Sequence, residues 1–323
     1  MSSSLKMSLL PFLRCPRCRC RLSTAVSIKY HEEIKEGMLT CEICRSEYPI
    51  LAFIPRFVPH ERYSRSFSIQ WNMFPKTQLD HGQKTESRDA FIDKTGIDPE
   101  LLSGKIVLDA GCGMGRFSEV VSNEPKNTVV SFDLSQSVDA AFANLGSRSN
   151  VHIVQGDIMM PPFTDESFDL IFSIGALHHM PDPRKGFRKL VPLLRKGGEI
   201  AIWVYAQGRW VIMSDIYREF TSRMPHSMVL TLSKLLIKLY TIYRKLPWLA
   251  ILLPISMHKE PEWRLLDTFD WYSPKYQHKY TGKQVLSWFT EMGLQDIKLH
   301  MFPVSASGRR PITYGPAQIK LKT

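Results

Sequence analysis

The feature that most constrains the fold is an apolar run that ends in an acid and leads into a glycine-rich turn. Residues 105–109 read as a buried strand, and Gly111, Gly113 and Gly115 follow it before a helical stretch over 117–122. Because glycine carries no side chain, such a turn brings backbone N–H groups close to a bound nucleotide-like ligand. Many turns contain a GxG pattern, so the segments that follow must decide what this one means.

Four more apolar strands alternate with segments of helix length. We expect them over residues 128–132, 151–154, 168–173 and 198–205. This alternation predicts an α/β fold with a parallel sheet and helices on both of its faces. Asp133 ends the second strand, where a carboxylate can accept from both ribose hydroxyls of an adenosine. Asp157 follows the third strand, where it can accept from an adenine amino group.

Taken in order, residues 109–116, Asp133, residues 156–157 and residues 173–179 resemble the signature segments of class I S-adenosylmethionine (SAM) methyltransferases. The resemblance spans about residues 88–206 and implies a Rossmann-like enzyme with SAM as its cofactor. A dehydrogenase more typically shows GxGxxG, and here Arg116 stands where the third glycine would be. By resemblance, the cofactor is bound by Asp109, Gly111, Gly113, Gly115, Asp133, Leu134, Asp157, Ile158 and Ser173.

Four cysteines near the N-terminus form two CxxC pairs. Cys15 and Cys18 make the first pair, and Cys41 and Cys44 make the second, with 22 residues between the pairs. Two such knuckles complete a tetrahedral four-sulfur zinc site, which has no open position and is therefore structural rather than catalytic. Disulfides are disfavoured because residues 1–13 lack a secretory signal. Cys20 remains an alternative ligand to Cys18, although CxxC is the commoner geometry.

The second knuckle is followed by Tyr-Pro-Ile and then by Ile-Pro-Arg-Phe, at residues 48–50 and 54–57. Residues 11–60 resemble the small zinc ribbon called Trm112-like, which in some proteins stands alone as an activator of methyltransferases. We therefore divide the chain into a zinc ribbon (1–60), a helical linker or cap (61–100), a SAM-binding core (101–206), a helical lid or substrate insertion (207–280) and a C-terminal completion of the core (281–323).

Two segments outside the core are predicted to be helical. Phe67, Trp71 and Phe74 share one helix face, which favours a helix packed on the core over one that covers the cofactor. Residues 226–256 combine leucines with lysines, and we favour an ordinary helical cap there. A lid over an apolar substrate, a peripheral membrane contact and a dimer contact are the alternatives. A helix over 282–292 and a strand over 295–301 then resume the core.

The candidate catalytic residues lie after the fourth strand and in an aromatic segment. His178 and His179 follow the strand at the carboxyl edge of the sheet, where either could orient the acceptor or remove a proton. Residues 267–280 are read as a substrate-binding loop that contributes Tyr272, Tyr276 and His278. Local packing without chemistry is the alternative for each of them.

Charge and composition leave three functions open. Residues 207–323 carry 17 Lys and Arg against 8 Asp and Glu, which indicates an anionic partner or substrate, or a solvated surface. We favour methyl transfer to a small-molecule acceptor, apolar or anionic. RNA methylation is an alternative, although the Asn/Asp-Pro-Pro-Tyr motif of exocyclic-amine methylation is absent after the fourth strand. A non-catalytic SAM-binding partner protein is the third. With no secretory signal and no long charge-free apolar run, we expect a cytoplasmic protein of undetermined oligomeric state.

Overall fold

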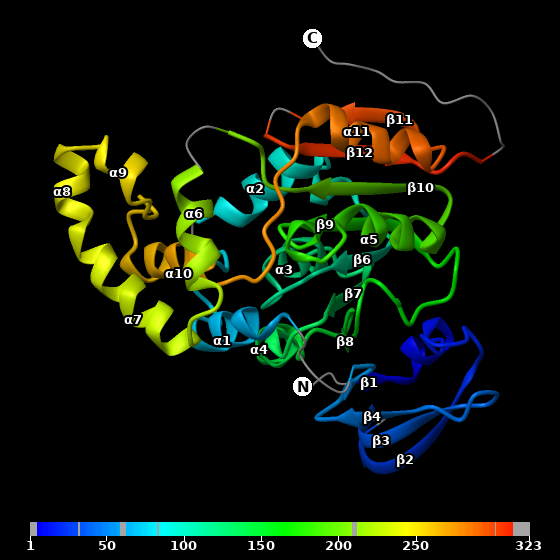
Figure 1. Cartoon of the computed structure of the whole chain (residues 1–323). Coiled ribbons are helices and arrows are strands. Elements are labelled where there is room, and N and C mark those ends of the chain that lie inside the picture. The colour runs from blue at the N-terminus through cyan, green and yellow to red at the C-terminus, as the bar shows by residue number, and fades with distance from the viewer. Residues whose placement is uncertain are drawn as a thin grey trace.

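A computed structural model places a seven-stranded sheet at the centre of the molecule, with an antiparallel ribbon at one edge and a group of helices beyond its carboxyl end (Figure 1). The structure describes residues 5–31, 33–58, 63–82, 84–208, 212–300 and 302–312. No helix among these residues is long and apolar enough to cross a membrane. The predicted α/β class is confirmed.

The central sheet has the strand order β11-β12-β10-β9-β6-β7-β8. Strands β6 to β10 run parallel, and β12 pairs antiparallel with both β10 and β11. The order reverses between β6 and β9, and ligands of open α/β sheets bind outside the carboxyl ends of the strands at such a point. The strands are β6 (Ile106–Ala110), β7 (Thr128–Asp133), β8 (Val151–Gln155), β9 (Phe168–Ile174), β10 (Leu194–Trp203), β11 (Gln295–Leu299) and β12 (Ser305–Arg309).

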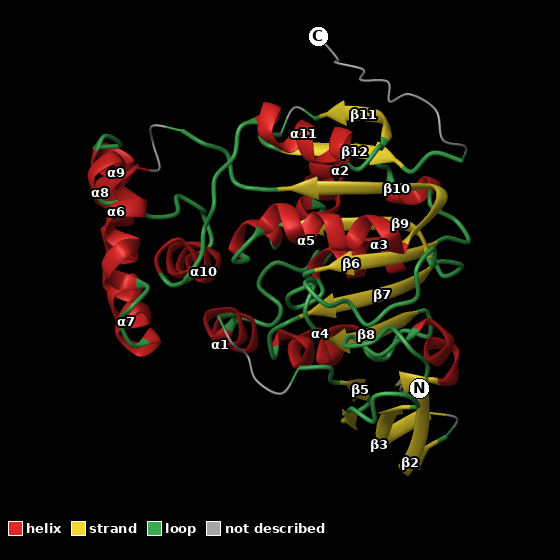
Figure 2. Cartoon of the chain, turned by 45° about the vertical axis from the view of Figure 1, so that its right-hand side comes forward, coloured by secondary structure: helices red, strands yellow, loops and turns green. Residues whose placement is uncertain are grey.

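Helices cover both faces of this sheet (Figure 2). One face packs α2 (Glu86–Thr95), α3 (Arg116–Ser122) and α4 (Ser137–Leu145) into an apolar cluster around Phe91 and Phe172. The other face packs α5 (Pro183–Leu190) and α11 (Gly282–Glu291). Residues at the N-terminus of each helix determine where it begins. Asp182 caps α5 before a proline, and Thr281 forms a capping box with Gln284 at the start of α11.

The ribbon is an antiparallel sheet docked against the edge strand β8. Arg56 pairs with Gln155 of β8, and the Phe57 N–H donates to the Gln155 carbonyl at 2.8 Å. The ribbon therefore covers an edge that would otherwise expose unpaired backbone groups. Its elements are β1 (Leu5–Lys6), a 3-10 helix (Met7–Phe12), β2 (Leu22–Tyr30), β3 (Glu33–Cys41), β4 (Glu47–Leu51) and β5 (Ile54–Pro55).

The helical cap lies beyond the carboxyl ends of the strands (Figure 2). It has its own apolar core, built around Val229, Tyr243, Phe269 and Tyr272. Its helices are α6 (Ile212–Thr221), α7 (His226–Leu236), α8 (Tyr240–Lys245), α9 (Leu249–Leu252) and α10 (Pro261–Tyr272), and α1 (Arg65–Met73) of the linker packs beside α10.

Three details differ from the sequence predictions. Residues 267–272, predicted as the first part of a loop, form the last part of α10. Leu265, Phe269 and Tyr272 are buried at helical spacing, so packing against the cap core favours the helix. The strand β12 was not predicted, because its sequence Ser-Ala-Ser-Gly-Arg carries no apolar pattern. Met301, the end of the predicted strand 295–301, lies outside the described residues.

Candidate active site

A cavity of about 850 Å³ lies at the carboxyl ends of β6 to β9, where the strand order reverses. The sheet supplies the glycine turn after β6 together with the residues that end β7, β8 and β9. The linker helix α1 and the cap helix α10 supply the opposite wall. The site therefore lies between the core and its two helical additions.

The glycine turn has a backbone that only glycine accommodates well. Gly111 has φ +96°, and a Cβ there would lie 2.1 Å from the Cβ of Ala176. Gly113 has φ +55°, and a Cβ there would lie 3.0 Å from Trp71 Nε1. Trp71 and Phe67 of α1 line the cavity, so this helix both packs on the core and covers the glycine turn.

Asp133 is held at the end of β7 with its carboxylate toward the turn. Its Oδ2 accepts from the Gly113 N–H at 2.9 Å, and its Oδ1 accepts from the Ser135 N–H at 2.8 Å. The Ser135 hydroxyl can donate its hydrogen bond to either of two acceptors, Asp133 Oδ1 at 2.7 Å or Ser137 Oγ at 2.6 Å. Asp133 therefore keeps acceptor capacity for a ligand.

Asp157, Ile158 and Leu134 also line the cavity, as the sequence led us to expect. The chain after Ile158 is held by the ribbon. The Arg19 guanidinium donates to the Pro161 carbonyl at 2.7 Å and pairs with Asp165. The ribbon thus supports the loop that forms one end of the cavity.

Three residues predicted to bind the cofactor lie behind the cavity wall. Asp109 is buried and accepts from the Ser118 hydroxyl at 2.7 Å, and burial raises its pKa to about 7. The Ser173 hydroxyl donates to the Ala110 carbonyl at 2.6 Å. A Cβ on Gly115 would lie 2.7 Å from Leu145 Cδ1, inside the core. These residues support the turn from behind.

The two adjacent histidines occupy different environments. His178 is fully buried and stacks on Tyr205 with ring centroids 3.9 Å apart, and burial lowers its pKa well below the usual value. His179 lines the cavity, and its Nδ1 lies 2.9 Å from the Tyr276 carbonyl. Because a carbonyl only accepts, Nδ1 carries the proton and the lone pair remains on Nε2. Burial lowers the pKa of His179 to about 4, so the ring is neutral at pH 7.

The other catalytic candidates do not line the cavity. Tyr272 lies in the cap core, where its hydroxyl donates to the Pro254 carbonyl at 2.6 Å. The His278 N–H donates to the His178 carbonyl at 2.8 Å, and its ring stacks on Tyr276 outside the cavity wall. The aromatic segment therefore positions His179 through the Tyr276 carbonyl.

A half-buried Tyr–Asp pair that was not predicted faces the cavity. Tyr205 follows β10, and its hydroxyl donates to Asp270 Oδ2 of α10 at 2.9 Å. Burial raises the pKa of Asp270 to about 6 and keeps Tyr205 protonated by raising its pKa well above the usual value. Trp263, Asp267 and Asp270 fall at i, i+4 and i+7 of one helix, which is the signal that could have found this face.

Lys94 of α2 brings a titratable amine to the same cavity. Its Nζ lies 4.4 Å from the Trp203 ring centroid and 4.9 Å from that of Phe302. Among the described residues it has no ion pair, and burial lowers its pKa to about 7. At this pKa the amine is about half protonated at pH 7, and an anionic group bound beside it would favour the charged form.

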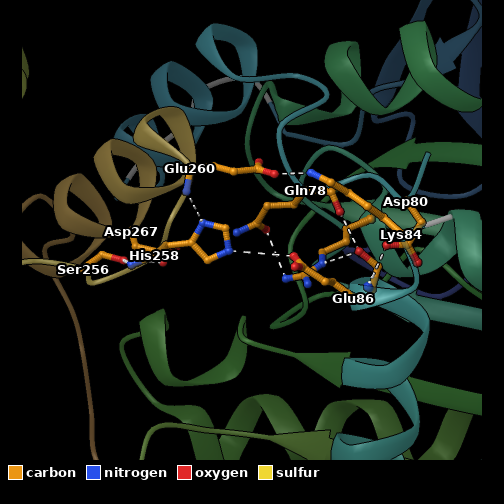
Figure 3. Close-up of polar contacts among 10 residues, drawn as sticks. Gln78, Asp80, Lys84, Glu86, Ser256, His258, Glu260 and Asp267 are labelled. Atoms are coloured by element: carbon orange, nitrogen blue, oxygen red, sulfur yellow. Dashed lines mark hydrogen bonds and ion pairs between the residues drawn. The ribbon is translucent and has the colours of Figure 1, made fainter. Parts of the chain in front are cut away.

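Polar contacts join the cap to the segment before α2 (Figure 3). Lys84 pairs with Glu260 at the start of α10, and His258 lies 3.8 Å from Glu86. The Ser256 hydroxyl donates to Asp267 Oδ2 at 3.0 Å. The Lys84 and His258 contacts therefore tie the start of α10 to the start of α2.

The two CxxC knuckles meet in the ribbon as a four-sulfur cluster. The sulfurs of Cys15, Cys18, Cys41 and Cys44 lie within 4.8 Å of one another, and Cys20 is outside the group. A tetrahedral zinc ion with Zn–S bonds of about 2.3 Å needs sulfurs about 3.8 Å apart, so the four thiols fit it. The Tyr48 hydroxyl lies 3.3 Å from Cys15 Sγ and can donate to a thiolate there.

Two family models match separate parts of the chain. Residues 108–202 match the family described as Methyltransferase domain, and residues 6–50 match the family of Trm112p-like proteins. These matches confirm a methyltransferase domain, whose family implies SAM as cofactor, and a Trm112-like domain whose cysteine cluster is consistent with structural zinc.

Individual relatives match over about a third of the chain. A tRNA U34 carboxymethyltransferase of Campylobacter fetus subsp. fetus is 35% identical over 117 residues, 35% of this chain and 41% of that protein. Methyltransferase GfsG of Streptomyces halstedii is 32% identical over 107 residues, 32% of this chain and 38% of that protein. The chain thus spans about two fifths of their length. A solved complex of the Haloferax volcanii Trm112 methyltransferase activator with a methyltransferase has a TM-score of 0.46 and 13% identity, covering 76% of this chain and 97% of that one.

Proposed function

Because the chain contains a methyltransferase domain preceded by a Trm112-like domain, we propose that it transfers a methyl group from SAM to a small-molecule acceptor. The observation that carries this proposal is the cavity beside the glycine turn. Its volume of about 850 Å³ falls in the upper range of small-molecule sites, which leaves room for an acceptor next to a nucleoside cofactor.

SAM supplies a methyl group on a positively charged sulfur, which is already electrophilic. The protein must therefore bind, align and exclude water. Asp133 offers its remaining lone pairs to ribose hydroxyls, and a second lone pair becomes free when Ser135 turns its proton toward Ser137. Asp157 and Ile158 form the adenine end, and Trp71 closes the cavity over Gly113.

Asp270 is the best-matched proton acceptor for an acceptor that must lose a proton. A pKa of about 6 leaves it mostly ionised at pH 7 and close to the working pH, where general-base catalysis is most effective. Tyr205 fixes its orientation through the 2.9 Å hydrogen bond. His179, with a pKa of about 4, is the weaker base and is better suited to accept a hydrogen bond through Nε2.

The cavity composition favours an acceptor that is largely apolar and carries an anionic group. Trp203, Trp263 and Trp271 line it, and Lys94 stands against Trp203 with no carboxylate bonded to it among the described residues. An acceptor carboxylate or phosphate would form a charge-assisted hydrogen bond with Lys94 in this water-poor site.

RNA methylation is the second candidate, favoured by the tRNA-modifying relatives and by the formal charge of +11. An RNA enzyme would bring one nucleotide into the cavity and hold the flanking phosphates on a basic rim. Salt dependence separates the two functions, because phosphate contacts make nucleic-acid binding fall steeply with salt.

Calorimetric titration of the zinc-loaded protein with SAM and S-adenosylhomocysteine is the first test. We expect micromolar binding of both, followed by tritium transfer from labelled SAM to apolar anionic metabolites. Transfer to tRNA alone would replace the small-molecule proposal with the RNA one. If neither compound bound, the cofactor site would be refuted and a non-catalytic protein would become the better explanation.

A further inference from the structure

The outer surface of the cap carries an apolar stripe that the proposed reaction does not use. The helix α7, a 3-10 turn and α8 form one helical run over residues 226–245. Met228, Leu235 and Ile242 stand on its outer side and are 53%, 56% and 46% exposed. Seven residues make about two helical turns, so these side chains lie on one line along the run.

A basic stripe lies beside the apolar one. Lys234, Lys238 and Lys245 are exposed. At 3.6 residues per turn Lys234 stands about 100° around the helix from Leu235 and Lys245 about 60° from Ile242, in the same direction, and Lys238 lies in the 3-10 turn between them. None of the three has an ion pair among the residues that the structure describes. The whole segment 220–259 contains six Lys and Arg and no Asp or Glu. This surface therefore carries both exposed apolar side chains and positive charge.

Two residues that line the cavity are exposed in the segment that follows this helical run. Ile251 lines the cavity and is 39% exposed, and Pro247 likewise lines the cavity and is exposed. Trp248 between them is 54% exposed. In both views α8 and α9 lie at the outer end of the cap, away from the ribbon (Figures 1 and 2). An apolar molecule that entered the cavity past Pro247 and Ile251 would first meet exposed apolar side chains.

We propose that this face of the cap docks on an anionic lipid bilayer and that the cavity takes its apolar acceptor from that bilayer. A basic helix with an apolar side and an exposed tryptophan has the composition of helices that lie in the membrane interface. The lysines meet anionic headgroups while Leu235, Ile242 and Trp248 enter the acyl boundary. Docking stands on the surface alone, whereas the origin of the acceptor rests on the proposed methyl transfer.

Charge and apolar area together favour a bilayer over other occupants. A second copy of the chain docked through this face would bring the lysine stripe against itself or close to it, where like charges repel. An RNA would use the lysines but would leave the apolar line exposed. An anionic bilayer satisfies both stripes at once.

Vesicle sedimentation without SAM tests the docking. We expect the protein to sediment with equimolar phosphatidylglycerol and phosphatidylcholine but weakly with phosphatidylcholine alone. The Lys234→Glu/Lys238→Glu/Lys245→Glu variant should bind the mixed vesicles on the order of 100-fold more weakly, since each lysine contributes roughly five-fold. Leu235→Ser/Ile242→Ser should lose binding at every salt concentration.

A matched control reverses three exposed lysines elsewhere, as Lys126→Glu/Lys196→Glu/Lys283→Glu. The docking proposal is refuted if this control loses as much binding as the cap variant, or if the wild type ignores the mixed vesicles. It is also refuted if a concentration-dependent dimer disappears in Leu235→Ser/Ile242→Ser. SAM titration of the same proteins distinguishes membrane docking from methyl transfer. Loss of cofactor binding would refute methyl transfer without changing sedimentation with vesicles.

Discussion

Replacing Asp133 by alanine tests the cofactor site most directly. Its carboxylate accepts from the N–H groups of Gly113 and Ser135, so the change removes a ligand acceptor and leaves two turn donors without their partner. A hydrogen bond to a charged group contributes about 1.5–3 kcal/mol. The dissociation constant of SAM should therefore rise between about 10-fold and about 150-fold, with the upper end reached if the turn also loosens.

Calorimetric titration with SAM and S-adenosylhomocysteine measures this change. Glu47→Ala is the matched control, because Glu47 is an exposed carboxylate of β4 with no ion pair among the described residues. Asp133→Asn separates charge from geometry, since the amide keeps one acceptor oxygen. If Asp133→Ala folds normally and binds SAM as tightly as the wild type, Asp133 does not hold the ribose and the assignment of this cavity end is wrong.

Three further predictions follow from other parts of the structure. Cys41→Ser or chelation of zinc should unfold the ribbon and weaken SAM binding at least about three-fold through the loop that Arg19 holds, as seen by circular dichroism and calorimetry. Methyl transfer that needs a base should rise with pH through about 6, where Asp270 ionises, and Asp270→Asn should abolish that rise in a pH–rate profile. Lys94→Met should raise KM for anionic acceptors about ten-fold or more while leaving the SAM affinity unchanged, and neutral ester analogues should be unaffected.

Much of the core could be predicted because its signals are local. Each parallel strand is a short apolar run, and cavity-lining residues stand at its end or within two positions after it, as Gly111, Asp133 and Asp157 do. The spacing of the four cysteines likewise predicts that their sulfurs form one cluster. Where sequence neighbours are also spatial neighbours, pattern is enough.

The proposed acceptor side of the cavity could not be predicted in the same way, because it is assembled from segments far apart in the sequence. Tyr205 and Asp270 are 65 residues apart, and they meet only because the cap folds back over the end of β10. Within α10, Tyr272 was predicted as a catalytic candidate because it is aromatic. Its face of the helix packs into the cap core. The opposite face, with Trp263 and Asp270, lines the cavity. Which face of α10 packs into the cap core depends on the helices it contacts, and the sequence of α10 alone does not show this.

The two additions to the core act on different ends of one cavity, and this separation has a measurable consequence. The ribbon holds the loop after Ile158 at the proposed adenine end, whereas the cap and Lys94 line the proposed acceptor end. Residues far apart and without shared partners have additive free-energy effects, within about 0.5 kcal/mol. Cys41→Ser combined with Lys94→Met should therefore show the SAM defect of the first and the acceptor defect of the second, simply added. A large coupling between them would mean that ribbon and cap communicate through the sheet, and the cavity would then behave as one cooperative unit rather than two independent halves.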